Sequence, residues 1–261
     1  MTEGFVPPSV VVGVDGSRVG LQAALWAIDE AIGRDLPLRL VVAAEGDVDA
    51  AEKAVNEAAA EVVRTGRAVT VATEVLEGNP TQVLIEASCR AAMVCVGAVG
   101  PRHFSHARFG STAVGLAAAA HCPVAVVRGT PRPDGLVVVE LDQSPDSAAV
   151  LQYAVEEARL RQAPLRALGT WQSADPNQES ARLVHAHLDR RLEEWRHRYP
   201  ALDVHPIAVE GGGLGYLVDN AGAIQLIIVG ARNAAAVDEL LGPALNDTHC
   251  SILVVDSQRL L

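Results

Sequence analysis

The chain alternates short, continuous apolar runs with longer segments in which apolar residues recur at helical spacing. The runs are typical of strands that are buried on both faces of a sheet. We expect such strands at residues 9–15, 36–44, 92–97 and 123–127, and an alternating edge strand within residues 68–78. Because strands and helices alternate throughout, the pattern predicts an α/β fold with a parallel sheet that is covered by helices on both faces.

The expected helices carry start signals of known chemistry. Asp15 and Ser17 have short polar side chains that can cap a first helix, and Pro80 falls in the first turn of a third helix, where its missing amide is tolerated. The apolar stripe predicted for the first helix consists of Leu21, Leu25, Ile28 and Ile32. The stripe predicted for the second helix consists of Ala51, Val55, Ala58 and Val62.

The two halves of the chain resemble each other. A shift of 127 residues places Asp15 on Asp142, and "HCPVAVV" in the first half matches "HCSILVV" in the second. Such a repeat indicates a tandem duplication. We therefore predict two domains, residues 8–130 and residues 134–257, each with a five-stranded parallel sheet. The Pro- and Gly-rich segment 129–135 joins them.

Composition narrows the class of protein. The net charge of −11 argues against nucleic acid or an anionic membrane surface as the main partner. No window approaches the ~20 apolar residues of a membrane span, and the first ten residues lack a signal-peptide pattern, so we expect a soluble, cytoplasmic protein. The cysteines lie in or beside apolar stretches without paired spacing, which favours buried free thiols and no metal site. They are Cys89, Cys95, Cys122 and Cys250.

The segment from 97 to 112 has the composition of a phosphate-binding loop. Its glycines expose backbone N–H groups, and Ser111 and Thr112 open a helix whose amides favour an anion. Ligands of parallel sheets bind beyond the carboxyl ends of the strands, where the winding reverses. If the winding reverses between the first and fourth strands, Asp15 and Gly97 line one crevice. That suits a nucleotide, with its ribose on Asp15. The alternative is that Asp15 only caps a helix and the glycines only form a turn.

The motifs "VGVDGS", "GNP", "G-x2-G-x9-GS" and "HCPVAVV" together resemble the universal stress protein family, in its tandem two-domain form and its ATP-binding branch. The resemblance implies two Rossmann-like domains of the adenine nucleotide alpha hydrolase-like type, pairing of the domains through their fifth strands, and a homodimer of chains. It also implies ATP as the cofactor and leaves open whether Mg²⁺ accompanies it. The ATP-binding residues that it implies are Gly13, Val14, Asp15, Ala43, Val96, Gly97, Gly100, Gly110, Ser111 and Thr112.

The chain departs from this pattern inside the loop of the first domain. Arg102 and Arg108 stand where the family is often Gly-rich, and they either reach a phosphate or remain in solvent.

In the second copy the phosphate seat is altered. Gly230 remains, but Asn233 replaces the second glycine. Aligned from the shared His-Cys pair, Asp238 and Glu239 fall on Gly110 and Ser111. Aligned on Gly242 instead, the following Pro243 lacks an amide donor. Repulsion by the two carboxylates in the first alignment, or the missing donor in the second, predicts a degenerate second site, with one nucleotide per chain, in the first domain.

Three functions remain open at this stage. The first is an ATP-binding regulator of a stress response that is not an efficient enzyme. The second is a slow ATPase, for which His103, His106 and Asp15 are the nearby candidates for a base. The third is an interaction module that holds no nucleotide. The sequence contains neither a P-loop motif nor an evident nucleophile–base pair, and we expect the regulator.

Overall fold

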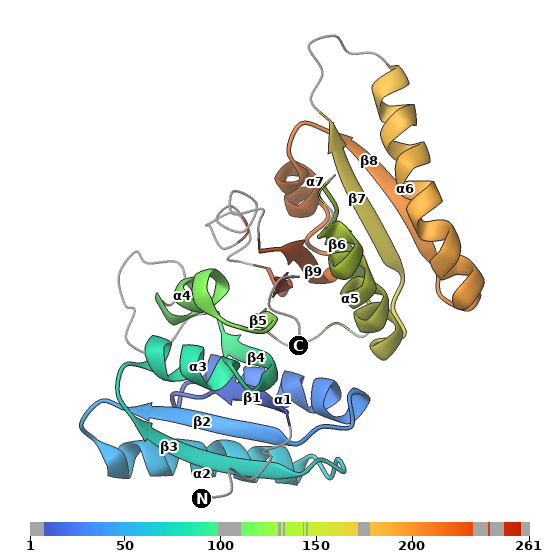
Figure 1. Ribbon diagram of the computed structural model, residues 1–261. Helices are drawn as coiled ribbons and strands as arrows, with labels where there is room; N and C mark the ends of the chain where they lie inside the picture. Colours follow the sequence, from blue (N-terminus) through green and yellow to red (C-terminus); the bar gives the residue numbers. More distant parts are fainter. Residues whose placement is uncertain are drawn as a thin grey trace, which may run out of the picture. The chain divides into compact units, whose positions relative to one another are not determined.

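The computed structural model describes residues 8–98, 111–129, 132, 134–142, 144, 146–171, 178–231, 240 and 248–256. The chain divides into two compact units, residues 1–129 with 259–261 and residues 130–258. Each described unit is an α/β structure with one parallel sheet and helices on both faces, which confirms the predicted fold class. The repeat seen in the sequence therefore corresponds to two copies of one architecture (Figure 1).

The first unit contains five parallel strands in the order β3-β2-β1-β4-β5. The strands are β1 (Ser9–Gly13), β2 (Leu38–Ala44), β3 (Val71–Glu77), β4 (Ala91–Gly97) and β5 (Val124–Val127). The helices are α1 (Arg18–Gly33), α2 (Val48–Arg64), α3 (Pro80–Ser88) and α4 (Ser111–Ala119). α1 contacts α2, and α3 contacts α4 beside it.

The winding of this sheet reverses between β1 and β4. The chain proceeds from β1 outward through β2 to β3, and then returns to the other side of β1 for β4 and β5. The carboxyl ends of β1 and β4 are direct neighbours, since Gly13 pairs with Val96. This is the topological switch point at which parallel α/β sheets form ligand crevices. The reversal on which the predicted crevice depends is therefore present.

The second unit repeats the same order, β8-β7-β6-β9-β10, again with every described strand pair parallel. Its strands are β6 (Leu136–Glu140), β7 (Leu165–Trp171), β8 (Val204–Glu210), β9 (Ile224–Gly230) and β10 (Ser251–Val255). Its described helices are α5 (Ser147–Leu160), α6 (Gln178–Arg198) and α7 (Gly213–Asp219). In Figure 1, α6 and α7 lie on opposite sides of β7 and β8.

The helix stripes predicted from the sequence are right for α2 and wrong for much of α1. All four predicted residues of α2 are buried. In α1, however, Leu25 is 37% exposed and Ile32 is 38% exposed, and of the predicted stripe only Ile28 is fully buried. Alanines form much of the buried face, including Ala23, Ala27 and Ala31. Small side chains allow the helix to lie close to the strands, and the sequence pattern of large residues missed this.

One cysteine also departs from expectation. Cys95, Cys122 and Cys250 are buried free thiols, but Cys89 is exposed. Cys89 is the residue that ends α3, where the chain turns at the surface. Burial raises the pKa of Cys122 to about 12, which makes that thiol a poor nucleophile at neutral pH.

Candidate functional site

A cavity of about 460 Å³ lies at the carboxyl ends of β1, β2 and β4 in the first unit. Its size is typical of small-molecule sites. The first residues of α2, α3 and α4 complete its walls. The sequence-predicted residues that line it are Gly13, Val14, Asp15, Ala43, Val96, Gly97, Ser111 and Thr112. The predicted Gly100 and Gly110, and also Arg102, Arg108, His103 and His106, lie outside the described residues.

Asp15 is an exposed residue in the cavity wall and is fixed by the serine that follows it. Its Oδ1 accepts hydrogen bonds from the Ser17 N–H at 3.0 Å and from the Ser17 hydroxyl at 2.5 Å. The Ser17 hydroxyl in turn accepts from the Gly20 N–H at 3.0 Å and so caps α1. No described residue donates to Asp15 Oδ2. The carboxylate is therefore held by one oxygen and can accept hydrogen bonds from a ligand with the other.

Two of the predicted glycines allow close packing at the base of the cavity. A Cβ on Gly13 would lie 2.6 Å from Leu84 Cδ1, so a side chain there would have to displace Leu84. A Cβ on Gly97 would lie 2.7 Å from the carbonyl carbon of Val19. Gly97 is thus required for the approach of β4 to the first turn of α1, whether or not its N–H also contacts a ligand.

Several lining residues were not predicted from the sequence. Asn79 and Asp47 cap the helices that border the cavity: Asn79 Oδ1 accepts from the Thr81 N–H at 3.0 Å, and Asp47 Oδ1 accepts from the Ala50 N–H at 2.9 Å. Glu45 lies beside them in the wall. A helix that follows a parallel strand begins at the carboxyl edge of the sheet. The cap residues Asn79 and Asp47 could have been assigned to the crevice on that ground alone.

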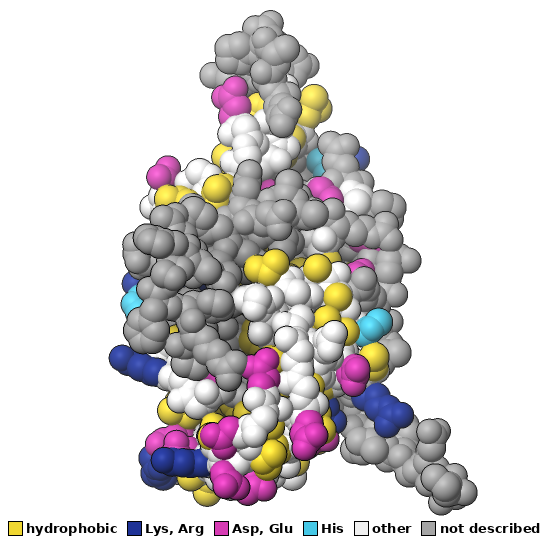
Figure 2. Space-filling view, turned by 90° about the vertical axis from the view of Figure 1, so that its left-hand side faces the viewer, with side chains coloured by type: hydrophobic (Ala, Val, Ile, Leu, Met, Phe, Trp, Pro, Cys, Tyr) yellow, Lys and Arg dark blue, Asp and Glu magenta, His cyan; other side chains and the backbone are white. Residues whose placement is uncertain are grey.

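The described lining is acidic. It contains the carboxylates of Asp15, Glu45 and Asp47, and it contains no Lys, Arg or His side chain. On the face drawn in Figure 2, Asp and Glu side chains are widely spread, whereas Lys and Arg lie mainly near the margins of the view. An anionic group in the described part of the cavity would therefore depend on hydroxyl and backbone N–H donors. Ser111 and Thr112, in the first turn of α4, are placed to supply them.

The equivalent aspartate of the second unit is engaged by its own surroundings. Asp142 Oδ1 accepts from the Ser144 N–H at 3.0 Å, the Ser144 hydroxyl at 2.6 Å and the Ser147 hydroxyl at 2.5 Å. Ser147 aligns with Gly20 of the first unit. Nη1 of Arg191, on α6, donates to the Asp142 carbonyl oxygen at 3.1 Å. Burial raises the pKa of Asp142, but the serine hydrogen bonds and the Arg191 charge outweigh it and leave the pKa below the usual value.

A second replacement lies at the end of the strand. Glu140 of β6 aligns with Gly13 of β1. A carboxylate oxygen of Glu140 lies 3.1 Å from the position that a Cβ on Gly213 would take, at the start of α7. The second unit thus fills this part of its crevice with its own side chain. The predicted loop residues Asn233, Asp238, Glu239, Gly242 and Pro243 lie outside the described residues.

The described residues contain no group of three or more His, Cys, Asp or Glu side chains arranged to hold a metal ion. None of the described helices combines the length and the apolar character that crossing a bilayer requires.

A family model, sequence relatives and a solved structure that resemble this chain all belong to one family. A family model described as the universal stress protein family matches residues 8–128. Universal stress protein Rv2028c of Mycobacterium tuberculosis is 41% identical over 283 aligned residues, which cover 100% of both chains. Universal stress protein Rv2624c of the same organism is 38% identical over 265 residues, covering 95% of this chain and 96% of the relative. The crystal structure of a universal stress protein from Archaeoglobus fulgidus has a TM-score of 0.69 at 14% identity, covering 95% and 96% of the two chains; this likeness concerns the fold.

Proposed function

The chain belongs to the universal stress protein family, and on this premise we propose that its first unit binds ATP and that the protein acts as a nucleotide-dependent regulator of a stress response. The observation that carries the proposal is that Asp15 and the first turn of α4 line the same cavity. An aspartate with one oxygen held and one available suits a pair of ribose hydroxyls. Hydroxyl and amide donors at a helix N-terminus suit phosphate oxygens.

The proposal places one nucleotide in each chain. In the first unit, Gly13 and Gly20 leave the crevice and the carboxylate of Asp15 accessible. In the second unit, Glu140 and Ser147 stand at these two positions, and Ser147 hydrogen-bonds the aspartate. A carboxylate such as that of Glu140 also repels an anionic ligand, at about 1–4 kcal/mol for unit charges 4 Å apart near a protein surface. On this proposal the second unit has the same fold as the first but binds no nucleotide.

A regulatory role fits the described side chains better than efficient catalysis. The carboxylates of the lining have structural partners: Asp15 holds Ser17, and Asp47 caps α2. The described lining offers no His or Cys that could act with a serine as a nucleophile–base pair. Nucleotide binding would instead change the shape or the partners of the protein. The homodimer and the cytoplasmic location expected from the sequence remain predictions, which a solution mass and cell fractionation can measure.

Mass spectrometry of small molecules released from the purified, denatured protein tests the proposal. We expect ATP, in an amount close to one equivalent per chain. The Asp15→Ala variant should release little nucleotide while keeping its far-ultraviolet circular dichroism spectrum. The Asp142→Ala variant is the matched control and should release as much as the wild type. A wild-type protein that releases no adenine nucleotide and binds none on addition would contradict the proposal.

A further inference from the structure

A group of aromatic and cationic side chains lies at the end of α5 and α6 in the second unit. It consists of Trp195, Tyr199, Arg159 and Arg198, and we refer to it as the Tyr199 platform. The two rings are stacked, with centroids 6.2 Å apart and an interplanar angle of 12°. The guanidinium carbon of Arg159 lies 4.0 Å from the Tyr199 centroid, and that of Arg198 lies 5.5 Å from it. Two cations from different helices therefore share one ring.

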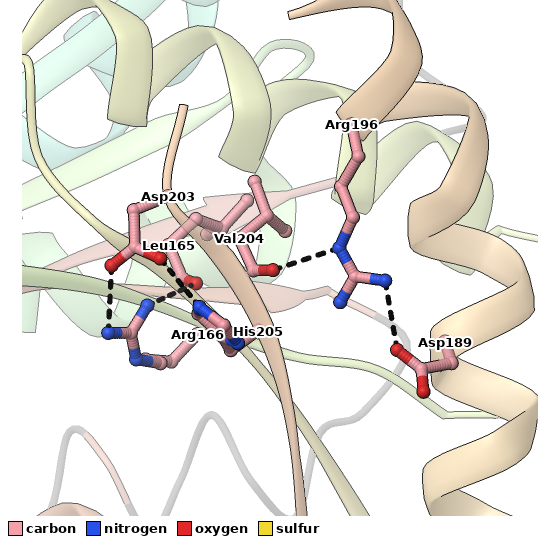
Figure 3. Close-up of polar contacts among 7 residues, drawn as sticks. All are labelled: Leu165, Arg166, Asp189, Arg196, Asp203, Val204 and His205. Atoms are coloured by element: carbon pink, nitrogen blue, oxygen red, sulfur yellow. Dashed lines mark hydrogen bonds and ion pairs between the residues drawn. The ribbon is translucent and has the colours of Figure 1, made fainter. Parts of the chain in front are cut away.

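Arg159 and Arg198 contact an aromatic ring, whereas Arg166 and Arg196 of the same unit are each paired with an aspartate. Figure 3 shows the neighbouring pattern: Arg166 donates to Asp203 at 3.0 Å, and Arg196 donates to Asp189 at 2.9 Å and to the Val204 carbonyl. In the described part of the chain, Arg159 and Arg198 form neither an ion pair nor a hydrogen bond. Both are exposed, whereas the two rings are half-buried. The platform thus holds two uncompensated positive charges on the surface of a chain whose net charge is −11.

The contact with the ring leaves the donors of these arginines available, since neither guanidinium donates to a described residue. A guanidinium that lies over an aromatic ring uses its flat face, so its five N–H groups still point outward in the plane of the fork. Both residues are in the last turn of their helices, where a cation is favourable because of the helix dipole. The helix dipole stabilises a positive charge at these positions, but it leaves the N–H donors of both arginines without an acceptor. The platform is therefore positively charged, and its guanidinium donors have no partner among the described residues.

We propose that the Tyr199 platform is a docking site for an acidic segment of a partner protein, with carboxylates binding to Arg159 and Arg198. Charge complementarity selects the partner: guanidinium forks match carboxylate oxygens in pairs. Trp, Tyr and Arg are also the residues most enriched among those that dominate binding energy in protein interfaces. Nucleic acid fits less well, because its long run of phosphates would meet the negative charge of the rest of the chain.

A fluorescein-labelled hexaglutamate peptide, followed by fluorescence anisotropy with the full chain, tests the docking site. We expect the Arg159→Ala/Arg198→Ala double variant to bind the peptide about tenfold more weakly than the wild type, or worse. The matched control is the Arg182→Ala/Arg190→Ala double variant, which removes two exposed arginines of α6 that contact no described aromatic ring or carboxylate. It should change the affinity by less than about twofold, since surface charges away from a site contribute little.

Tyr199 supplies a second, independent variant pair. Tyr199→Phe keeps the ring under both arginines and should bind hexaglutamate like the wild type, whereas Tyr199→Leu removes the ring and should weaken binding. Unchanged far-ultraviolet circular dichroism shows that each variant is folded. Equal weakening by the two arginine double variants would overturn the proposal, because it would indicate unspecific attraction. So would the absence of peptide binding to the wild type, or tighter binding of a single-stranded oligonucleotide than of the peptide.

Discussion

The crevices of the two units share the same aspartate–serine turn but differ in the side chains that surround the aspartate. Asp15 and Asp142 each accept two hydrogen bonds from the serine two residues later, at nearly equal distances. The difference lies at the next helical turn, where Gly20 contributes no side chain and Ser147 contributes a third hydrogen bond to the carboxylate. The turn is therefore a structural element that both copies need. In both copies no described residue donates to Oδ2, so the copies differ in what contacts Oδ1 and not in the second carboxylate oxygen.

Glu140 and Gly13 extend this contrast to the base of the crevice. Gly13 has no side chain, and Leu84 and the cavity occupy the space beside it. At the equivalent position of the second unit, the Glu140 side chain points to the start of α7. The second unit uses these two positions for contacts within its own fold, and we expect it to bind no nucleotide. Four predictions follow from this contrast, and two of them transfer a residue of the second crevice into the first.

Gly13→Glu should have the largest effect. The variant introduces the glutamate of the second unit into the first, where it fills the cavity and opposes an anionic ligand. We expect the ATP affinity to fall by about a hundredfold or more, which corresponds to about 2.8 kcal/mol. Isothermal titration calorimetry measures this. Glu140→Gly, the reciprocal change, should leave the affinity of the first unit unaltered, and an equal loss in both variants would break the comparison.

Asp15→Ala and Asp142→Ala should separate binding from stability. Loss of Asp15 removes a charged acceptor of the proposed ribose hydroxyls, so ATP affinity should fall by about tenfold or more. Loss of Asp142 removes acceptors from Ser144 and Ser147, and the free energy of unfolding should fall by about 1 kcal/mol. Calorimetry and urea denaturation give the two quantities. Reduced ATP affinity in Asp142→Ala with full affinity in Asp15→Ala would reverse our assignment.

Gly20→Ser should have an intermediate effect. A Cβ on Gly20 would lie 2.7 Å from Asp15 Oδ1, so the carboxylate must shift, and the new hydroxyl competes for it. We expect the ATP affinity to fall by about threefold to tenfold, equivalent to about 0.7–1.4 kcal/mol. Gly20→Ala is the control that adds the Cβ without the hydroxyl. An affinity at or above that of the wild type in Gly20→Ser would show that this glycine does not distinguish the crevices.

The pH dependence of stability should give the smallest effect. Because Asp142 has a pKa below the usual 3.8 in the folded protein, its interactions stabilise fully above that value. The contribution is lost as the pH falls through the lower folded-state pKa. Urea denaturation between pH 5 and pH 2.5 should therefore show a steeper loss of stability in the wild type than in Asp142→Asn. Parallel curves for the two proteins would exclude a native-state pKa shift at this residue.

Much of the fold was predictable because its signals are local. Continuous apolar runs identified the buried strands, and Ser17 and Pro80 marked helix starts as expected. The reversal of winding placed Asp15 and Gly97 at one cavity. The α1 stripe failed because close packing selected alanines over the larger Leu25 and Ile32.

The crevice was less predictable, since its walls depend on contacts between distant segments. Asn79 could have been placed at the crevice from its position at a helix start, but Glu45 enters the lining only through the arrangement of the strands and helices around it. The replacements at Glu140 and Ser147 were visible in the repeat alignment, but their meaning required the hydrogen bonds of Asp142. A serine in the first turn of a helix has many ordinary roles, and the sequence alone does not reveal which acceptor it meets.

Isothermal titration calorimetry of ATP into nucleotide-free protein tests the central claim most directly. The account predicts a stoichiometry near one per chain for the wild type and for Glu140→Gly, and binding at least about a hundredfold weaker for Gly13→Glu. A stoichiometry near two, or a site of wild-type affinity in Gly13→Glu, would contradict the assignment of the nucleotide to the first unit alone.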